Sequence, residues 1–68
     1  MSTQQTQIYE RAALGTEAGA GYIGVSRPTL YRLLDSGEIP SFHIGRRRLI
    51  RKADLDKFIE DRMAEEGQ

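Results

Sequence analysis

GVSRPTLYRLL, residues 24–34, is the stretch of this 68-residue chain that decides the fold. Ser26 is a preferred helix N-cap, because its hydroxyl can accept a hydrogen bond from an unpaired amide of the first turn. Pro28 follows closely, and proline is tolerated in a helix only in that first turn. A helix is therefore predicted to begin at about Arg27.

The predicted helix has one apolar side and one polar side. Leu30, Leu33 and Leu34 are spaced at i, i+3 and i+4, so they form an apolar stripe. The other side carries Arg27, Pro28, Tyr31, Arg32 and Asp35. One side is thus expected to pack, and the other is free to contact a ligand.

A second, shorter helix is predicted just before it, over Thr16–Ile23. Gly24 can adopt the left-handed conformation that ends a helix, so residues 24–26 read as a tight turn between the two helices. Two short helices joined in this way form the helix-turn-helix pattern, whose second helix enters the DNA major groove. A helical hairpin in some other small core has the same pattern, so this segment alone leaves both interpretations open.

Charge is segregated along the chain, although the formal net charge is zero. Residues 27–52 hold seven basic and two acidic residues, a net charge of +5, and five of those seven cations lie within residues 46–52. Residues 53–68 hold two basic and six acidic residues, a net charge of −4. This asymmetry favours a module with one polyanion-facing side over an ordinary solvated surface.

The chain becomes extended after the helix pair. Gly37 ends the second helix, and Pro40 imposes extended backbone on the residue before it. Residues 41–44, SFHI, alternate polar and apolar, which predicts a strand whose apolar side faces the core. Residues 48–50, RLI, can return antiparallel to that strand, so a β-hairpin is expected.

The tip of this hairpin is rich in arginine. Residues 45–47 form the connection, in which Gly45 supplies a positive φ and Arg46 and Arg47 are exposed. An arginine-rich hairpin of this kind can bind phosphates or enter a narrow minor groove. The alternative is an edge hairpin that its charge protects from aggregation.

An amphipathic helix is predicted over residues 52–64. Its packing stripe consists of Leu55, Phe58, Ile59 and Met63. Lys57 and Asp61 are spaced for an i, i+4 ion pair.

The chain is expected to form one domain over residues 14–64. Residues 1–13 are predicted to be a partly disordered lead-in, and residues 65–68 are predicted to fray. The segment over residues 8–14 is expected to be either helical or extended. At this length only one small core can form, so no deep active-site cleft is expected.

The composition argues against several classes of protein. Cysteine is absent, so no disulfide or thiolate metal site can form. No apolar run approaches the roughly 18 residues of a membrane span, and no signal segment is recognisable, so a soluble cytoplasmic protein is expected. One histidine and scattered helix acids provide no nucleophile–base pair or metal site, so neither enzyme activity nor a cofactor is expected.

Several segments occur in the order and spacing of a known family. They are Glu17, residues 20–34 (AGYIGVSRPTLYRLL), residues 37–40 (GEIP), residues 44–47 (IGRR) and residues 50–55 (IRKADL). With them the chain resembles the excisionase-type, MerR-like winged-helix DNA-binding domains over residues 14–59. The resemblance implies a mainly α fold with a small β-hairpin: a helix-turn-helix, a two-stranded wing and a C-terminal packing helix.

The resemblance also implies which residues bind double-stranded DNA. The second helix would enter the major groove, and the wing would lie against the backbone or the minor groove. The implied helix contacts are Ser26, Arg27, Pro28, Thr29, Tyr31 and Arg32. The implied wing contacts are His43, Gly45, Arg46, Arg47 and Arg48.

This chain departs from the family pattern in three places. Gly19 and Gly21 replace residues that favour helix, and Gly15 replaces a hydroxyl cap. Arg48 stands where the family often has an aromatic residue, and His43 stands where the family often has a cation.

The family includes small phage and mobile-element excisionases, which bind repeated sites, bend DNA and bias an integrase toward excision. The resemblance, with a chain too short for an added effector domain, favours an excisionase, or recombination directionality factor. The resemblance implies that the protein acts on DNA in the bacterial cytoplasm. It also implies an integrase as partner and self-association of copies along the DNA. The alternatives are a small transcriptional regulator that uses the same surface and a protein-interaction module whose wing binds an acidic partner.

Overall fold

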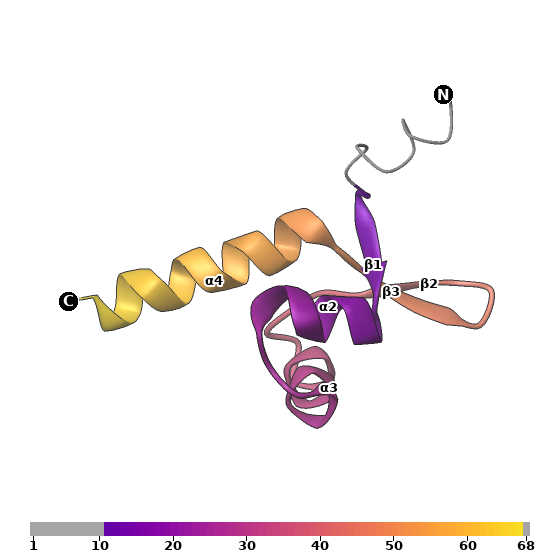
Figure 1. The fold of residues 1–68 in the computed structure, drawn as a ribbon, viewed down its shortest axis with the longest axis horizontal. Helices are drawn as coiled ribbons and strands as arrows, with labels where there is room; N and C mark the ends of the chain where they lie inside the picture. Colours follow the sequence, from indigo (N-terminus) through magenta and orange to yellow (C-terminus); the bar gives the residue numbers. More distant parts are fainter. Residues whose placement is uncertain (1–10, 68) are drawn as a thin grey trace.

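The computed structural model describes residues 11–67; residues 1–10 of the lead-in expected over residues 1–13, and the last residue of the expected tail, lie outside this range. Six elements follow one another: β1 (Ala13–Gly15), α2 (Thr16–Ile23), α3 (Arg27–Asp35), β2 (Phe42–Ile44), β3 (Arg47–Arg51) and α4 (Lys52–Glu66). In Figure 1 the β2–β3 hairpin and α4 extend toward opposite ends of the longest axis, with α2 and α3 between them.

The turn between α2 and α3 forms as predicted. Gly24 has a φ of 82°, and its amide donates to the Ala20 carbonyl at 2.8 Å, so a left-handed glycine ends α2. Ser26 is the N-cap of α3, and its Oγ accepts a hydrogen bond from the Thr29 amide at 3.3 Å. The predicted boundaries of this helix pair are confirmed.

The sheet has one strand more than predicted. β2 and β1 pair antiparallel with opposite edges of β3, giving the order β1-β3-β2, with Leu14 opposite Ile50. The expected two-stranded wing is therefore part of a three-stranded sheet. The physical reason is that β3 has two hydrogen-bonding edges, and residues 13–15 pair with the one that β2 leaves open.

The hairpin turn is one residue shorter than predicted. Gly45 and Arg46 form the turn, and Arg47 is already paired with Ile44 as the first residue of β3. Gly45 has a φ of 61°, and no residue type other than glycine has a positive φ in the described chain. Glycine at the first position of a two-residue turn is what a type II′ hairpin requires.

The core gathers apolar side chains from β1, β3, the three helices and the loops, and none from β2. Four of them have no more than a trace of exposed surface: Leu30, Ile39, Ile50 and Leu55. Leu34 is also buried, and Leu33 packs against the cluster, which confirms the apolar stripe predicted on α3. Burying such a side chain contributes about 1.5–3 kcal/mol each, so these few residues dominate the stability of the domain.

Helix α2 lies close to this core because of a glycine. A Cβ at Gly19 would lie 3.3 Å from Ile50 Cδ1 and 3.7 Å from Leu30 Cδ2. The same atom at Gly21 would meet nothing within 4 Å. Gly19 therefore permits close packing of the helix, whereas packing does not require Gly21.

The apolar side of β2 does not face the core, so that expectation is wrong. Phe42 is 37% exposed and Ile44 is 65% exposed. Directly paired residues share a face of a sheet, and Phe42 pairs with Leu49, which neighbours the buried Ile50. We call the side with Phe42, Ile44, Arg47 and Leu49 the outer face, and the side with Leu14, His43, Arg48 and Ile50 the core face.

Helix α4 packs through its first half only. Leu55 is buried and Phe58 is half-buried, whereas residues 60–67 are all exposed. Met63, expected on the packing stripe, is 68% exposed, because this part of α4 extends past the rest of the domain (Figure 1). The helix ends at Glu66, two residues later than expected, and an Arg62–Glu66 ion pair of 3.8 Å spans its last turn.

Among residues 11–67, no helix is both long enough and apolar enough to cross a bilayer.

Candidate nucleic-acid interface

The polar side of α3 carries a chain of hydrogen bonds. Ser26 Oγ donates to Thr29 Oγ1 at 3.0 Å, and Arg32 Nη2 donates to the same oxygen at 3.4 Å. The three residues are spaced at i, i+3 and i+6, so they lie on one line along the helix surface. Arg32 is exposed, and its guanidinium has the paired donors that can read a guanine in the major groove.

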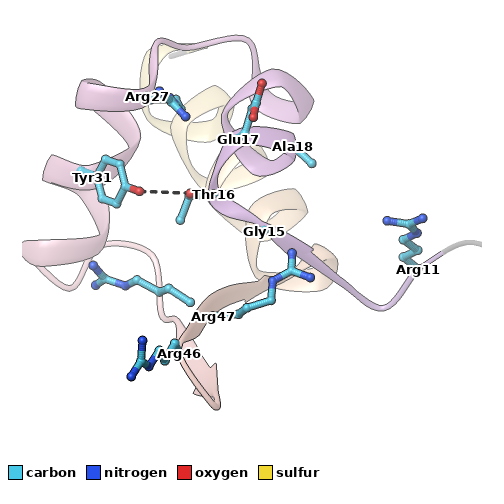
Figure 2. Close-up of a pocket in the computed structure, with 10 residues that line it drawn as sticks. Arg11, Gly15, Thr16, Glu17, Ala18, Arg27, Tyr31, Arg46 and Arg47 are labelled. Carbon is cyan, nitrogen blue, oxygen red and sulfur yellow. Dashed lines mark hydrogen bonds between the residues drawn. The ribbon is translucent and has the colours of Figure 1, made fainter.

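A second line of side chains runs beside the first. Arg27 and Tyr31 are one helical turn apart, and both are exposed. The Tyr31 hydroxyl lies 3.1 Å from Thr16 Oγ1, at the start of α2 (Figure 2). This hydrogen bond links the two helices of the helix-turn-helix through the exposed side of α3. Pro28 is exposed at the start of α3 and has no amide proton to leave unpaired.

An open depression lies between the helix pair and the hairpin, and we call it the arginine depression. Its lining consists of Arg11, Gly15, Thr16, Glu17, Ala18, Arg27, Tyr31, Arg46, Arg47 and Arg48. Figure 2 shows Arg27 and Tyr31 on the helix side and Arg46 and Arg47 on the hairpin side. Five arginines thus face this space with one carboxylate, an excess of positive charge that attracts polyanions.

Gly15 leaves room for one of these arginines. A Cβ at residue 15 would lie 3.0 Å from Arg47 Nη2, closer than side-chain carbons normally approach. The Arg47 side chain therefore passes over the start of α2, where the helix has no side-chain cap. Gly15, which stands where the family has a hydroxyl cap, thus leaves space for the Arg47 guanidinium.

The arginines of the hairpin differ in their partners. Arg48 lies on the core face, where its Nε donates to Ser41 Oγ at 3.0 Å and its Nη1 lies 3.3 Å from Asp35 Oδ1. Arg46 and Arg47 are exposed, and no ion pair within residues 11–67 involves either of them or Arg27. The charge of Arg48 is thus matched by a carboxylate, and the charges of Arg46 and Arg47 are not.

The structure gathers some of the implied contact residues and separates others. Arg27, Tyr31, Arg46, Arg47 and Arg48 meet at the arginine depression. The other implied contacts lie outside its lining: Ser26, Pro28, Thr29, Arg32, His43 and Gly45. Thr29 and Arg32 border a shallow groove at the far side of α3, and His43 is exposed in β2, opposite Arg48.

Cations away from the depression are held by acids. Arg51 binds Asp54 through two hydrogen bonds of 2.7 and 2.8 Å, and this hydrogen bonding and the carboxylate charge raise the pKa of the Arg51 guanidinium. The predicted Lys57–Asp61 pair is confirmed at 3.2 Å. Arg62 lies 3.9 Å from Glu38. The positive charge left without an acidic partner is therefore concentrated around α3 and the hairpin tip.

The sequence did not indicate every residue of this surface. Arg11 and Thr16 line the depression because β1 places the start of α2 beside the hairpin. The only signal for Arg11 was its charge, since it precedes a strand too short to be recognised by periodicity. Thr16 could not be predicted to line the depression, because its contact with Tyr31 depends on tertiary packing.

The chemistry of these residues suits anion binding. Guanidinium, hydroxyl and phenol groups donate hydrogen bonds to phosphate oxygens and base edges. Within residues 11–67, no group of three or more His, Cys, Asp or Glu side chains could hold a metal ion.

A model of the helix-turn-helix domain family matches residues 13–63, from the first strand into the second half of α4. The chain belongs to the helix-turn-helix domain family. Membership of this family implies DNA binding, and such domains are typically non-enzymatic. No curated protein and no solved structure gave a significant match to the chain.

Proposed function

We propose that this helix-turn-helix protein is a sequence-specific architectural factor of the excisionase type. It would bind repeated sites on double-stranded DNA, bend the DNA, and bias a phage or mobile-element integrase toward excision. The observation that carries this proposal is the arginine depression. It joins the exposed side of α3 to a hairpin tip whose arginines have no acidic partner among the described residues.

The position of each residue determines its proposed role in DNA binding. Arg32, at the end of the Ser26–Thr29 hydrogen-bond line, would contact a base edge in the major groove. Arg27, Arg46 and Arg47, which meet at the arginine depression, would bind phosphates beside that contact. Ser26 and Thr29 would support these contacts, and Tyr31 would hold α3 against α2.

Arg48 has a different part in the proposal. It is tied to Asp35 at the end of α3 and to Ser41 before β2, so it would set the angle between wing and helix. His43 and Gly45 would serve the wing, His43 as a further contact and Gly45 through its turn conformation.

The direction of α4 is compatible with this placement on DNA. The exposed second half of α4 carries Glu60, Asp61, Glu65 and Glu66, which phosphates would repel. Because α4 and the hairpin extend toward opposite ends of the molecule, the acidic helix can stay away from DNA bound at the wing (Figure 1).

A gel-shift titration on DNA from around the coding region and any neighbouring attachment site tests the proposal. Random duplex at matched salt is the control. Stepwise, cooperative complexes on an attachment-site fragment are expected, followed by protein-dependent stimulation of integrase-catalysed excision. Binding confined to a promoter would identify a transcriptional regulator instead. Failure to bind any duplex at low salt would reject both and leave a protein partner for the wing.

A further inference from the structure

An apolar side chain is exposed at the end of the hairpin. Ile44 is the last residue of β2 and directly precedes the Gly45–Arg46 turn. It is 65% exposed, and only Met63, at 68%, is comparable among the large hydrophobic residues of the described chain. Nothing in the fold requires a β-branched apolar residue at this position, because it packs against no part of the core cluster.

The neighbours of Ile44 are cations. Arg47 is its direct partner across the hairpin, so the two side chains share the outer face of the sheet. Arg46 lies in the turn two residues after Ile44. Both arginines are exposed without an acidic partner among the described residues. The tip therefore combines one apolar side chain with two positive charges.

This combination favours DNA as the occupant. A protein surface that covered Ile44 would also have to compensate two desolvated guanidiniums. DNA offers phosphates for the arginines and, in its minor groove, base steps into which architectural proteins insert apolar wedges. Arg47 also lines the arginine depression, so the direct cross-strand partner of Ile44 belongs to the proposed DNA-binding side.

The side chain itself has the stiffness that a wedge needs. Isoleucine is branched at Cβ and has few accessible χ1 rotamers, so little side-chain freedom is lost on insertion. The two-residue turn after it keeps the hairpin tip narrow.

We propose that Ile44 inserts between two base pairs from the minor groove and kinks the DNA, while Arg46 and Arg47 bind the flanking phosphates. This inference rests on the proposed function and deepens it, since it assigns the bending of DNA to one side chain.

The test uses the tightest-binding fragment from the titration above, shortened to about 30 base pairs. One set of duplexes carries donor and acceptor dyes at its ends to report bending. A second set carries 2-aminopurine at successive adenines, and its fluorescence rises where a base is unstacked. The proteins are the full chain, Ile44→Ser, Ile44→Val and Met63→Ser, the last being a control at an equally exposed site on α4.

The wild type is expected to bend the duplex and raise fluorescence at one step. Ile44→Ser should lose both signals and bind roughly tenfold more weakly, with an unchanged salt dependence because the phosphate contacts remain. Ile44→Val, which keeps a branched apolar side chain, and Met63→Ser should retain both signals.

If the Ile44→Ser variant bends and unstacks the duplex like the wild type, the inference is overturned, whereas the proposed function still stands. Weaker binding with undiminished fluorescence would overturn it as well, because Ile44 would then only touch the groove wall. Loss of cooperativity between copies with normal bending would instead place Ile44 at a protein–protein contact. A wild type that binds no duplex would fail at the earlier step, as a failure of DNA binding itself.

Discussion

Arg48 in β3 and Asp35 at the end of α3 form an ion pair, with 3.3 Å between Nη1 and Oδ1. The same arginine donates to Ser41 Oγ at 3.0 Å, so one side chain connects the wing, the loop before it and the helix. Its guanidinium is partly covered, with 27% of the side chain exposed, whereas 70% of the Asp35 side chain is exposed. The pair links the two elements that are proposed to contact DNA.

Asp35→Asn is expected to lower the ratio of specific to non-specific DNA binding. Without the pair the wing is looser relative to α3, while removal of a negative charge favours any duplex. Partly exposed ion pairs contribute about 0.2–1 kcal/mol, so the ratio of specific to non-specific binding should fall by up to about fivefold. Parallel titrations on the best site and on random duplex measure the ratio. A ratio equal to that of the wild type would show that the pair does not position the wing.

Changing Arg46 and Arg47 together to alanine should weaken binding to every duplex. For each phosphate that is no longer bound, the slope of log K against log salt concentration should become shallower by about 0.9. Affinities measured over a salt series give this slope. Arg62→Ala is a suitable control, because Arg62 is a cation of α4 that lies beside Glu38 and Glu66. An unchanged slope in the double variant would remove the wing from the DNA-binding surface.

Arg32→Ala should cost about 1–3 kcal/mol on the preferred site and relax the base preference at one position. Arg32 is held by Thr29 on the exposed line of α3, in a position from which a base edge can be reached. Titrations on the preferred site and on single-base variants of it measure this effect. Equal losses on preferred and random DNA would identify Arg32 as a phosphate contact.

Two glycines of the helix-turn-helix should respond to alanine in opposite directions. Gly21→Ala should stabilise the domain by about 0.5–1 kcal/mol, because the added Cβ meets nothing within 4 Å and alanine favours helix. Gly24→Ala should destabilise it by about 1 kcal/mol, since a φ of 82° is strained for any residue with a Cβ. Thermal unfolding followed by circular dichroism should give shifts of roughly 4–8 °C per kcal/mol for a domain of this size. Shifts of the same sign would contradict the assigned turn geometry.

The helix pair could be predicted because its signals are local. Ser26 caps α3 and Gly24 ends α2 through hydrogen bonds to residues within one turn, so neighbouring residues determine both boundaries. The third strand could not be predicted in the same way. A strand of three residues has no measurable periodicity, and β1 forms because Leu14 meets Ile50, far along the chain.

The orientation of β2 shows a second limit of sequence patterns. Alternation in residues 41–44 indicates a strand, but it does not say which side is covered. Here the core face ends in Arg48, which finds Asp35 and Ser41 there, and the apolar side of β2 is left outside. The same limit applies to the candidate DNA-binding surface. The arginines of the hairpin tip could be predicted from the sequence, but the partner of Arg48 could not, because it depends on how the hairpin lies against α3.

Strand β3 passes into α4 with no loop between Arg51 and Lys52. The Lys52 amide donates to the Ala12 carbonyl at 2.8 Å, and the two Arg51–Asp54 hydrogen bonds brace the same corner. With no loop residues and these hydrogen bonds, the connection leaves α4 little freedom to rotate relative to β3. A 15-residue helix is about 22 Å long, and the first half of α4 is packed on the core. The direction of α4 relative to the sheet is therefore fixed twice, by this corner and by the buried Leu55.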